Sequence, residues 1–271
     1  MKETQNYNYP PELKDPIETL SLADPELSRE VLYRLNKNHK QQFTVSAKDL
    51  VLLLEDTFWG LEREVSFGRA IATGFAELLG RGCVKKVPTF RKMVYESGET
   101  GPTLGRLMAE HLPPVLIHGS EDLLKHFTLA VNTMAAKGTY TLKTPLQVLS
   151  GLLNSEETDS AEAFLMLLND TFKKDLSYNQ SLHFSYILPR AVKNFPEDKR
   201  HRLISVFSRV LNADFLLAES FLEGLDKGLC HLSHSSLERF VSKGLEKLKI
   251  SRQMAAKFLS LESRLDRKSV V

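Results

Sequence analysis

Apolar residues recur every three or four positions in a series of short runs along this 271-residue chain. That period is typical of amphipathic helices. Such runs begin at Leu50, Leu123, Phe164, Leu203 and Leu237. No stretch shows alternating β-branched residues bounded by an Asn-Gly or Asp-Gly turn, which is the usual signature of a β-hairpin. The pattern therefore predicts an all-α protein, with helices of roughly 10–16 residues separated by short turns.

A weak internal repeat refines this prediction. Leu112-Pro113 recurs as Leu188-Pro189, an offset of 189 − 113 = 76 residues, and each pair is expected to lead through a polar turn into the next helix. Three leucines follow each pair at the same offset: Leu146, Leu149 and Leu153, then Leu222, Leu225 and Leu229. About 76 residues equals two helical hairpins of HEAT-like length. We therefore expect a short right-handed α-solenoid of HEAT/ARM-like helical hairpins, with an irregular multi-helix bundle as the alternative.

The expected domain organisation is simple. Residues 1–19 carry three prolines and no amphipathic pattern, which favours a flexible lead-in. Residues 20–265 are expected to form one helical-repeat domain, and residues 266–271 a C-terminal tail. The N-terminal segment lacks the apolar core of a signal peptide, and no apolar stretch reaches the roughly 18 residues that a membrane span needs. Together with only two cysteines, these features favour a cytoplasmic protein without a membrane partner.

Catalytic patterns are missing from the sequence. The segment Gly98–Arg106 has a glycine spacing reminiscent of a phosphate-binding loop, but it lacks the lysine, and no strand precedes it. It is better interpreted as an interhelical loop, with Gly98 as a C-cap and Gly101-Pro102 as the turn. There is no G-x-S-x-G motif, and the neighbouring acidic pairs Glu55-Asp56 and Glu156-Glu157 diverge on a helix. We expect a non-enzymatic protein without a cofactor.

One group of side chains has the chemistry of metal ligands. Cys230, His231 and His234 lie within five residues, and Cys230 and His234 would share a helix face. A structural zinc site needs four ligands, and no second Cys/His pair stands at ligand spacing. The sequence leaves open whether a metal binds near these three residues.

Two stretches are locally basic although the net charge is only +2. The cations selected as a possible basic surface are Arg190, Lys193, Arg200 and Arg202 in the first, which also contains Lys199, and Lys243 and Lys247 in the second, which also contains Lys249, Arg252 and Lys257. Acidic residues interleave with both, so a solvated outer face is one interpretation. A nucleic-acid-binding surface around 190–202 and 243–257 is the alternative, which would require the cations to gather on one concave face.

Large aromatic residues and glycines alternate between Phe58 and Gly80. Each glycine in a helix costs roughly 1 kcal/mol relative to alanine, so something local must offset it. Close helix–helix approach is the favoured explanation, and a groove for a partner helix or a small ligand is the other. If this region forms a binding surface, its residues are expected to be Trp59, Arg63, Phe67 and Arg69.

The C-terminal stretch resembles a recurrent feature of one bacterial group. It consists of a helix with Gly244-Leu245, followed by a helix with Ala255, Phe258 and the run Leu261-Glu-Ser263. It is similar to the helical-repeat region of bacterial von Willebrand factor A domain proteins of the nitric-oxide-reductase activation type. The resemblance implies an interaction scaffold beside a MoxR-type AAA+ ATPase in metalloenzyme maturation. The D-x-S-x-S metal motif of that family is absent, so no functional residue is carried over.

These patterns favour a non-catalytic helical-repeat scaffold for protein–protein interaction, accessory to an AAA+ ATPase if the resemblance holds. Stacked helical repeats expose extended concave surfaces, which suits this function. The alternative is a nucleic-acid-binding helical-repeat protein that uses the two basic stretches. Both hypotheses name a partner, protein in the first and nucleic acid in the second, and neither needs a cofactor.

Overall fold

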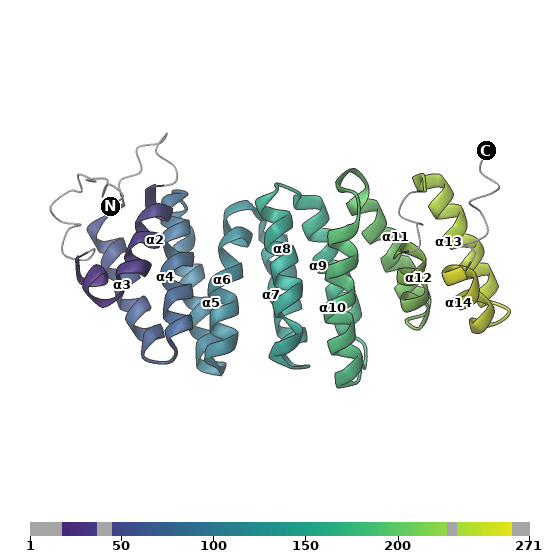
Figure 1. The fold of residues 1–271 in the computed structure, drawn as a ribbon, viewed down its shortest axis with the longest axis horizontal. Coiled ribbons are helices and arrows are strands. Elements are labelled where there is room, and N and C mark those ends of the chain that lie inside the picture. Colours follow the sequence, from purple (N-terminus) through teal and green to yellow (C-terminus); the bar gives the residue numbers. More distant parts are fainter. Residues whose placement is uncertain (1–17, 37–44, 227–231, 262–271) are drawn as a thin grey trace. The chain divides into compact units, whose positions relative to one another are not determined.

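The computed structural model of the protein describes residues 18–36, 45–226 and 232–261. Every regular element in these ranges is a helix, and no strand occurs among them, which confirms the all-α prediction (Figure 1). No helix in the described ranges is long and apolar enough to cross a membrane. The chain divides into two compact units, Met1–Ser120 (unit 1) and Glu121–Val271 (unit 2). The predicted domain of residues 20–265 spans both.

Unit 1 is organised around one glycine-rich helix, α4. This helix contacts α2, α3, α5 and α6, and most of its residues are buried. Helix α3 is capped by Ser46, whose hydroxyl accepts a hydrogen bond from the backbone N–H of Asp49. Residues 18–23 are also helical. The labelled helices of this unit are α2 (Pro25–Asn36), α3 (Ala47–Leu61), α4 (Val65–Gly80), the 3₁₀ helix η1 (Val84–Lys86), α5 (Val87–Thr100) and α6 (Pro102–His118).

The glycines of α4 let three neighbouring helices approach its backbone. A Cβ atom at Gly68 would lie 2.6 Å from the backbone nitrogen of Leu61 in α3. One at Gly80 would lie 2.1 Å from the Arg34 carbonyl oxygen in α2. No side chain fits at such distances, so these positions require glycine. Close helix packing, the favoured explanation for the glycine-rich run, is confirmed.

Leu112-Pro113 and Leu188-Pro189 were expected near turns, and this prediction is wrong. Pro113 lies inside α6 and Pro189 inside α10. A proline inside a helix cannot donate to the carbonyl four residues earlier, which for Pro113 is that of Ala109. Gly74 of α4 packs against this same carbonyl, since a Cβ there would stand 2.3 Å from its oxygen. Packing against a neighbouring helix thus accommodates a proline that would end an isolated helix.

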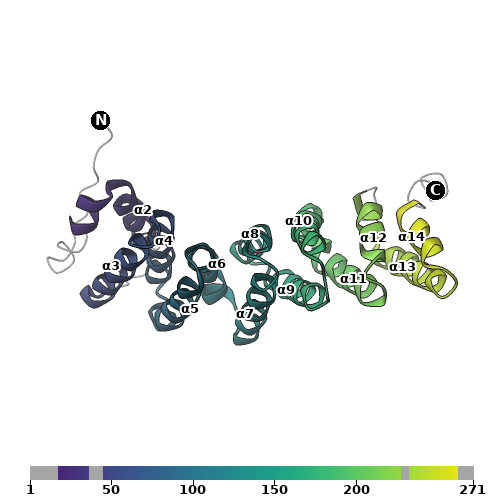
Figure 2. The ribbon, with the colours of Figure 1, turned by 90° about the horizontal axis from the view of Figure 1, so that it is seen from below.

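Unit 2 has two layers of helices (Figure 2). In one layer α9 contacts α7 and α11, and α11 contacts α13; in the other α10 contacts α8 and α12, and α12 contacts α14. Large side chains such as Phe127, Phe164 and Phe207 are fully buried. The labelled helices are α7 (Glu121–Ala135), η2 (Thr139–Thr141), α8 (Lys143–Asn154), α9 (Thr158–Phe172), α10 (Tyr178–Asn194), η3 (Glu197–Lys199), α11 (Arg200–Ala213), α12 (Leu217–Asp226), α13 (His234–Leu248) and α14 (Arg252–Leu261).

Candidate protein-binding groove

A groove of about 710 Å³ lies in unit 2, with α8 and α10 as its walls. The two helices contact each other and belong to the same layer. The volume is within the range of ligand-binding clefts. Only helical walls and the short segments after α8 and α10 contribute to it, so the groove is built by regular structure.

The α8 wall is small and partly apolar. Its lining residues are Thr144, Gln147, Val148, Gly151, Leu152 and Ser155. They are spaced three or four residues apart, as one stripe of a helix must be. Gly151 is exposed, and a Cβ atom built there would have no heavy atom within 4 Å. The wall is therefore open at this glycine, unlike the closely packed glycines of α4.

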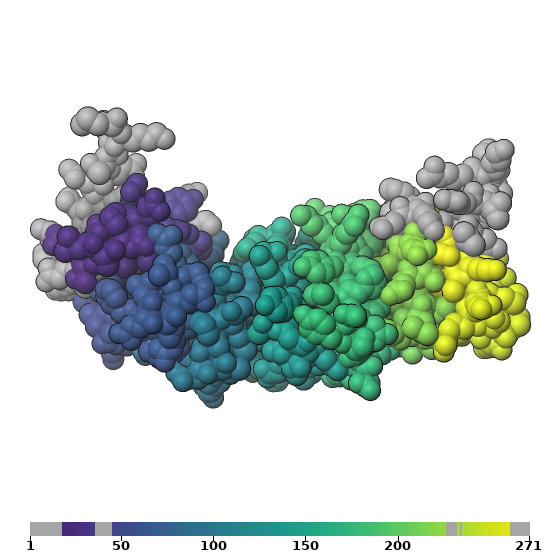
Figure 3. Space-filling model, turned by 60° about the horizontal axis from the view of Figure 1, so that its bottom comes forward, coloured from purple at the N-terminus to yellow at the C-terminus, as the bar shows by residue number. Residues whose placement is uncertain are grey.

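The α10 wall carries the larger and more polar side chains. Its lining residues are Tyr186, Pro189, Arg190 and Lys193. Three of them, Tyr186, Arg190 and Lys193, are exposed, and in space-filling form the green region that contains α10 lies at the surface (Figure 3). Tyr186 is 59% exposed, which is high for an aromatic ring. Exposed tyrosine and arginine are enriched at protein interfaces.

One end of the groove is fixed by Arg200. Its guanidinium pairs with Glu157 at the start of α9, and both side chains are largely buried. The Arg200 Nε and Nη2 atoms also donate to the carbonyl oxygens of Val192 (3.0 Å) and Phe195 (3.1 Å) at the end of α10. These bonds add to the capping of the α10 C-terminus, where the Val192 carbonyl also accepts a hydrogen bond from the Phe195 backbone N–H (3.3 Å). Arg200, predicted as part of a basic surface, thus ties α9 to α10.

The other two cations of the groove are free. Arg190 and Lys193 make no ion pair with any residue in the described ranges, and Glu197 lines the groove as an unpaired acid. The lining contains no histidine or cysteine, and its hydroxyl groups are those of Thr144, Ser155 and Tyr186. Its chemistry is that of a binding surface, with apolar contacts on α8 and an aromatic and two positive charges on α10.

The remaining predicted basic residues lie elsewhere. Arg202 is exposed on α11, and Lys243 is exposed on α13. The Lys247 ammonium on α13 lies 4.8 Å from the centre of the Phe258 ring, close enough for a cation–π contact. None of the three lines the groove. The six predicted cations are thus divided between both layers of unit 2.

Trp59, Arg63 and Phe67, three of the residues predicted as a binding surface in unit 1, lie together, but Phe67 is fully buried and so is part of the core. The Trp59 ring stacks on Tyr95 at a centroid distance of 4.0 Å and meets Phe67 edge-on at 5.4 Å. The Arg63 guanidinium lies over the other face of Trp59, with its carbon 3.9 Å from the ring centre. Both faces of the indole are therefore covered. Arg69 lies apart on α4 and pairs with Asp24 at 2.7 Å.

A buried carboxylate anchors this aromatic cluster. Asp56 is 1% exposed and accepts hydrogen bonds from Arg91 Nε (2.7 Å), Arg91 Nη2 (2.8 Å) and the Tyr95 hydroxyl (2.7 Å). Burial, followed by the hydrogen bond to Asp56, raises the pKa of Tyr95 to about 12. The Glu55-Asp56 pair, which diverges on a helix as expected, was interpreted from the sequence as solvated or helix N-terminal charge. For Asp56 this was wrong, because Arg91 on α5 compensates its burial.

Gly98 and Gly105 explain how the aromatic rings fit. A Cβ atom at Gly98 would lie 2.7 Å from the Trp59 ring, and one at Gly105 2.5 Å from the Phe67 ring. Gly98 is inside α5 rather than at its C-cap as predicted, and Gly101 caps the helix instead. The spacing that resembled a phosphate loop therefore serves ring packing between helices.

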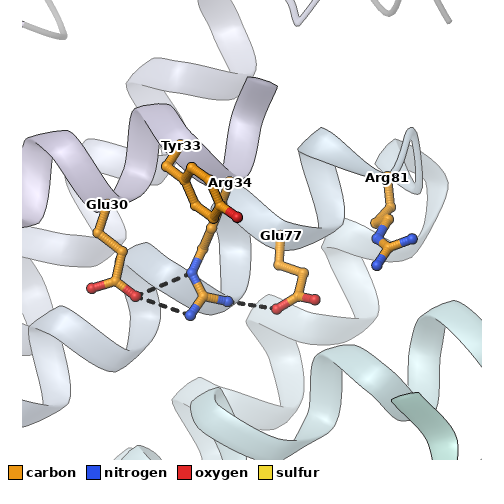
Figure 4. Close-up of a pocket in the computed structure, with 5 residues that line it drawn as sticks. All are labelled: Glu30, Tyr33, Arg34, Glu77 and Arg81. Atoms are coloured by element: carbon orange, nitrogen blue, oxygen red, sulfur yellow. Dashed lines mark hydrogen bonds and ion pairs between the residues drawn. The ribbon is translucent and has the colours of Figure 1, made fainter. Parts of the chain in front are cut away.

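A second, smaller pocket of about 130 Å³ lies in unit 1 (Figure 4). Arg34 of α2 stands between Glu30 and Glu77, at 2.9 and 2.6 Å, and so ties α2 to α4. Arg81 also lines the pocket, and its Nε atom is buried with no hydrogen-bond partner among the residues that the structure describes. That atom is closed to solvent, and Glu30 and Glu77 already pair with Arg34. The pocket therefore has few polar groups available to bind a ligand.

The possible metal ligands cannot be placed together. Cys230 and His231 lie outside the described residues, and His234 is the first residue of α13. Among the described residues, no three His, Cys, Asp or Glu side chains form a group that could hold a metal ion.

Comparison of the chain with protein-family models, with curated proteins and with solved structures found no match. The candidate site therefore depends on geometry alone. Of the predicted residues, only Arg190, Lys193 and Arg200 line the groove. Sequence reasoning missed the whole α8 wall and Tyr186. A signal for Tyr186 was present, since Tyr186, Arg190 and Lys193 stand at helical spacing on α10.

Proposed function

We propose that the protein is a non-catalytic helical-repeat scaffold that binds a segment of another protein in the groove between α8 and α10. The observation that carries this proposal is the groove itself, which combines exposed Tyr186, two cations without an acidic partner among the described residues, and a partly apolar α8 wall. A surface of this composition resembles the core and rim of a protein interface.

The repeat part of the proposal, a HEAT/ARM-like α-solenoid, is supported by the helix bounds. Helix α6 (102–118) and helix α10 (178–194) begin and end 76 residues apart, and so do α9 (158–172) and α13 (234–248). Pro113 and Pro189 stand at the same offset inside α6 and α10. Recurrence of whole helices at one period is what a repeat architecture requires.

Charge favours a protein over a nucleic acid as the partner. A nucleic-acid site gathers many cations along one face, because affinity comes mainly from phosphate contacts. Here Lys243 and Lys247 lie on α13, away from the groove, and Arg200 is engaged by Glu157. Glu197 also lines the groove, so its lining carries charges of both signs rather than a row of cations. Nucleic acid remains the alternative that the experiment must distinguish.

An AAA+ ATPase is the partner class that the C-terminal resemblance suggests. Within the described residues this stretch forms α13 and α14, which pack on each other, and Glu262 and Ser263 lie outside those residues. Gly244 is required at their contact, since a Cβ atom there would lie 2.6 Å from the Leu259 side chain. The residues that carry the resemblance therefore have a packing role as well.

Site-specific photo-crosslinking tests the proposal. A benzophenone amino acid at position 151 would project into the groove, and the same group at exposed Met166 on α9 is the control. We expect a protein adduct at 151, mapped by mass spectrometry to one segment of one partner, and no such adduct at 166. Adducts that disappear after nuclease treatment would instead support nucleic acid. The same adducts at both positions, or none at 151, would overturn the groove as the binding site.

A further inference from the structure

Two parallel observations suggest the kind of segment that the groove accepts. The α8 lining residues follow the spacing 144, 147, 148, 151, 152 and 155, and those of α10 follow 186, 189, 190 and 193. Each wall is thus one stripe of a helix, with side chains at i, i+3, i+4 and i+7. A third helix laid between such stripes can insert its own side chains between those of both walls, as helices pack in bundles.

The length of the walls sets the size of the segment. From Thr144 to Ser155 the helix rises by about 16 Å, at about 1.5 Å per residue. A partner helix of about three turns would cover that stripe. Gly151 leaves the middle of the α8 wall without a side chain, so the partner helix can come closest there.

The two cations of the α10 wall indicate which side chains a bound segment would carry. Arg190 and Lys193 are three residues apart on α10, so their side chains emerge on the same face about one turn apart. Both are exposed and unpaired among the described residues. Carboxylates one turn apart on a partner helix would meet both cations. The apolar residues Val148 and Leu152 on the opposite wall require an apolar stripe on the partner's other edge.

We propose that the groove binds an acidic amphipathic helix of about three turns, with carboxylates facing Arg190 and Lys193 and apolar residues facing Val148 and Leu152. This inference rests on the proposed function and specifies its partner. The occupant is a segment of another protein whose carboxylates complement the two cations, which have no acidic partner among the described residues, and whose apolar residues complement the partly apolar α8 wall.

Selection from a displayed library of random 15-residue peptides, with the full chain as bait, tests this inference. Peptides that bind the native chain but not the Gly151→Trp variant define the groove-specific set. The Met166→Trp variant is the matched control for an added exposed ring. We expect the groove-specific set to be enriched in Glu and Asp, with apolar residues at helical spacing. A proline placed in the middle of a selected peptide should abolish binding, since it breaks a helix.

Charge reversal gives the second measurement. The Arg190→Glu/Lys193→Glu double variant should weaken a selected acidic peptide by about tenfold or more, as expected for two ion pairs turned repulsive. The same variant should now select basic peptides. The Arg202→Glu/Lys243→Glu variant changes the net charge equally but leaves the groove untouched, and it should keep the native affinity.

The two proposals fail in different ways. Groove-specific peptides that are neutral or basic, or that tolerate the central proline, would overturn the acidic helix while leaving a protein-binding groove intact. A set of binders that Gly151→Trp does not affect would overturn the groove as a binding site, and with it the proposed function.

Discussion

Cationic side chains in unit 1 and in the groove of unit 2 have opposite surroundings. In unit 1, Arg34, Arg63 and Arg91 each pair with a carboxylate of a neighbouring helix. In unit 2, Arg190 and Lys193 line an open groove without an acidic partner among the described residues. The first set stabilises contacts between helices, and the second is available to a ligand. Each of these five side chains carries one positive charge, so the sequence does not separate the two sets. The presence of a carboxylate partner distinguishes them.

The two regions also differ in how they use glycine. Gly74 of α4 has no room for a side chain, whereas Gly151 of α8 faces open space. Where a neighbouring helix occupies the space that a side chain would need, the glycine supports a close helix contact. Where that space is open, the glycine leaves a gap in the wall. Unit 1 therefore has the properties of a packed core, and the α8–α10 face those of a surface that can be occupied.

The largest effect is expected from removing the buried carboxylate of unit 1. Asp56→Ala leaves Arg91 and the Tyr95 hydroxyl without their acceptor and should lower the free energy of unfolding by about 3 kcal/mol, since breaking a buried ion pair is costly. Trp59 is the only tryptophan and lies in this cluster, so its fluorescence during urea unfolding reports on unit 1. Glu99→Gln, at the exposed pair with Arg63, is the control and should resemble the native chain. Equal effects of both variants would contradict a special role for Asp56.

A methyl group at Gly74 should destabilise unit 1 almost as much. Gly74→Ala places a Cβ atom 2.3 Å from the Ala109 carbonyl oxygen, so α4 and α6 must separate. Overpacking of this kind lowers the free energy of unfolding by between about 2 and 3 kcal/mol. Urea unfolding followed by Trp59 fluorescence measures it, and a variant as stable as the native chain would disprove the close contact.

The stability of unit 1 should also fall with acid because of His111. Burial lowers the pKa of this histidine to about 4, against 6.5 in an unfolded chain. Between those values the unfolded state binds a proton that the folded state does not, so stability falls as pH decreases from 6.5 toward 4. The free energy of unfolding should be about 2 kcal/mol lower at pH 5 than at pH 7 from this group alone. His111→Gln should remove that part of the pH dependence; an unchanged pH slope in this variant would show that His111 is not responsible.

The smallest effect, and one of opposite sign to that in α4, is expected at Gly151. Gly151→Ala adds a methyl group in open space within a helix, where alanine is favoured by about 0.5–1 kcal/mol. Hydrogen exchange of α8 followed by mass spectrometry should show slower exchange than in the native chain. Faster exchange would mean that the α8 wall is closed at this position, and the contrast with Gly74 would then fail.

Much of the fold follows from local sequence signals. The apolar spacing predicts helices, and the described residues are all-α. Ser46 caps α3 as its S-x-x-D pattern indicates. The prolines at 113 and 189 misled the prediction, because local propensity places a proline at a helix boundary, while packing keeps both inside helices.

The candidate site was predicted only in part. Arg190 and Lys193 were selected for their charge, but the same reasoning selected Lys243 and Lys247, which lie on another helix and outside the groove. Trp59 was selected because it lies in the run of aromatic residues and glycines that could form a groove, yet both its faces are covered. Whether a side chain is free depends on what residues distant in sequence place beside it.

The sequence by itself determined that the chain is helical and where apolar faces recur, because helix periodicity is a local property with a period of 3.6 residues. The tertiary structure decided which cations have partners and which glycines face open space. Those outcomes depend on contacts such as Asp56 with Arg91, 35 positions apart, and Glu157 with Arg200, 43 positions apart. A pairing over such a separation exists only after the helices have packed, and so no local pattern could reveal it.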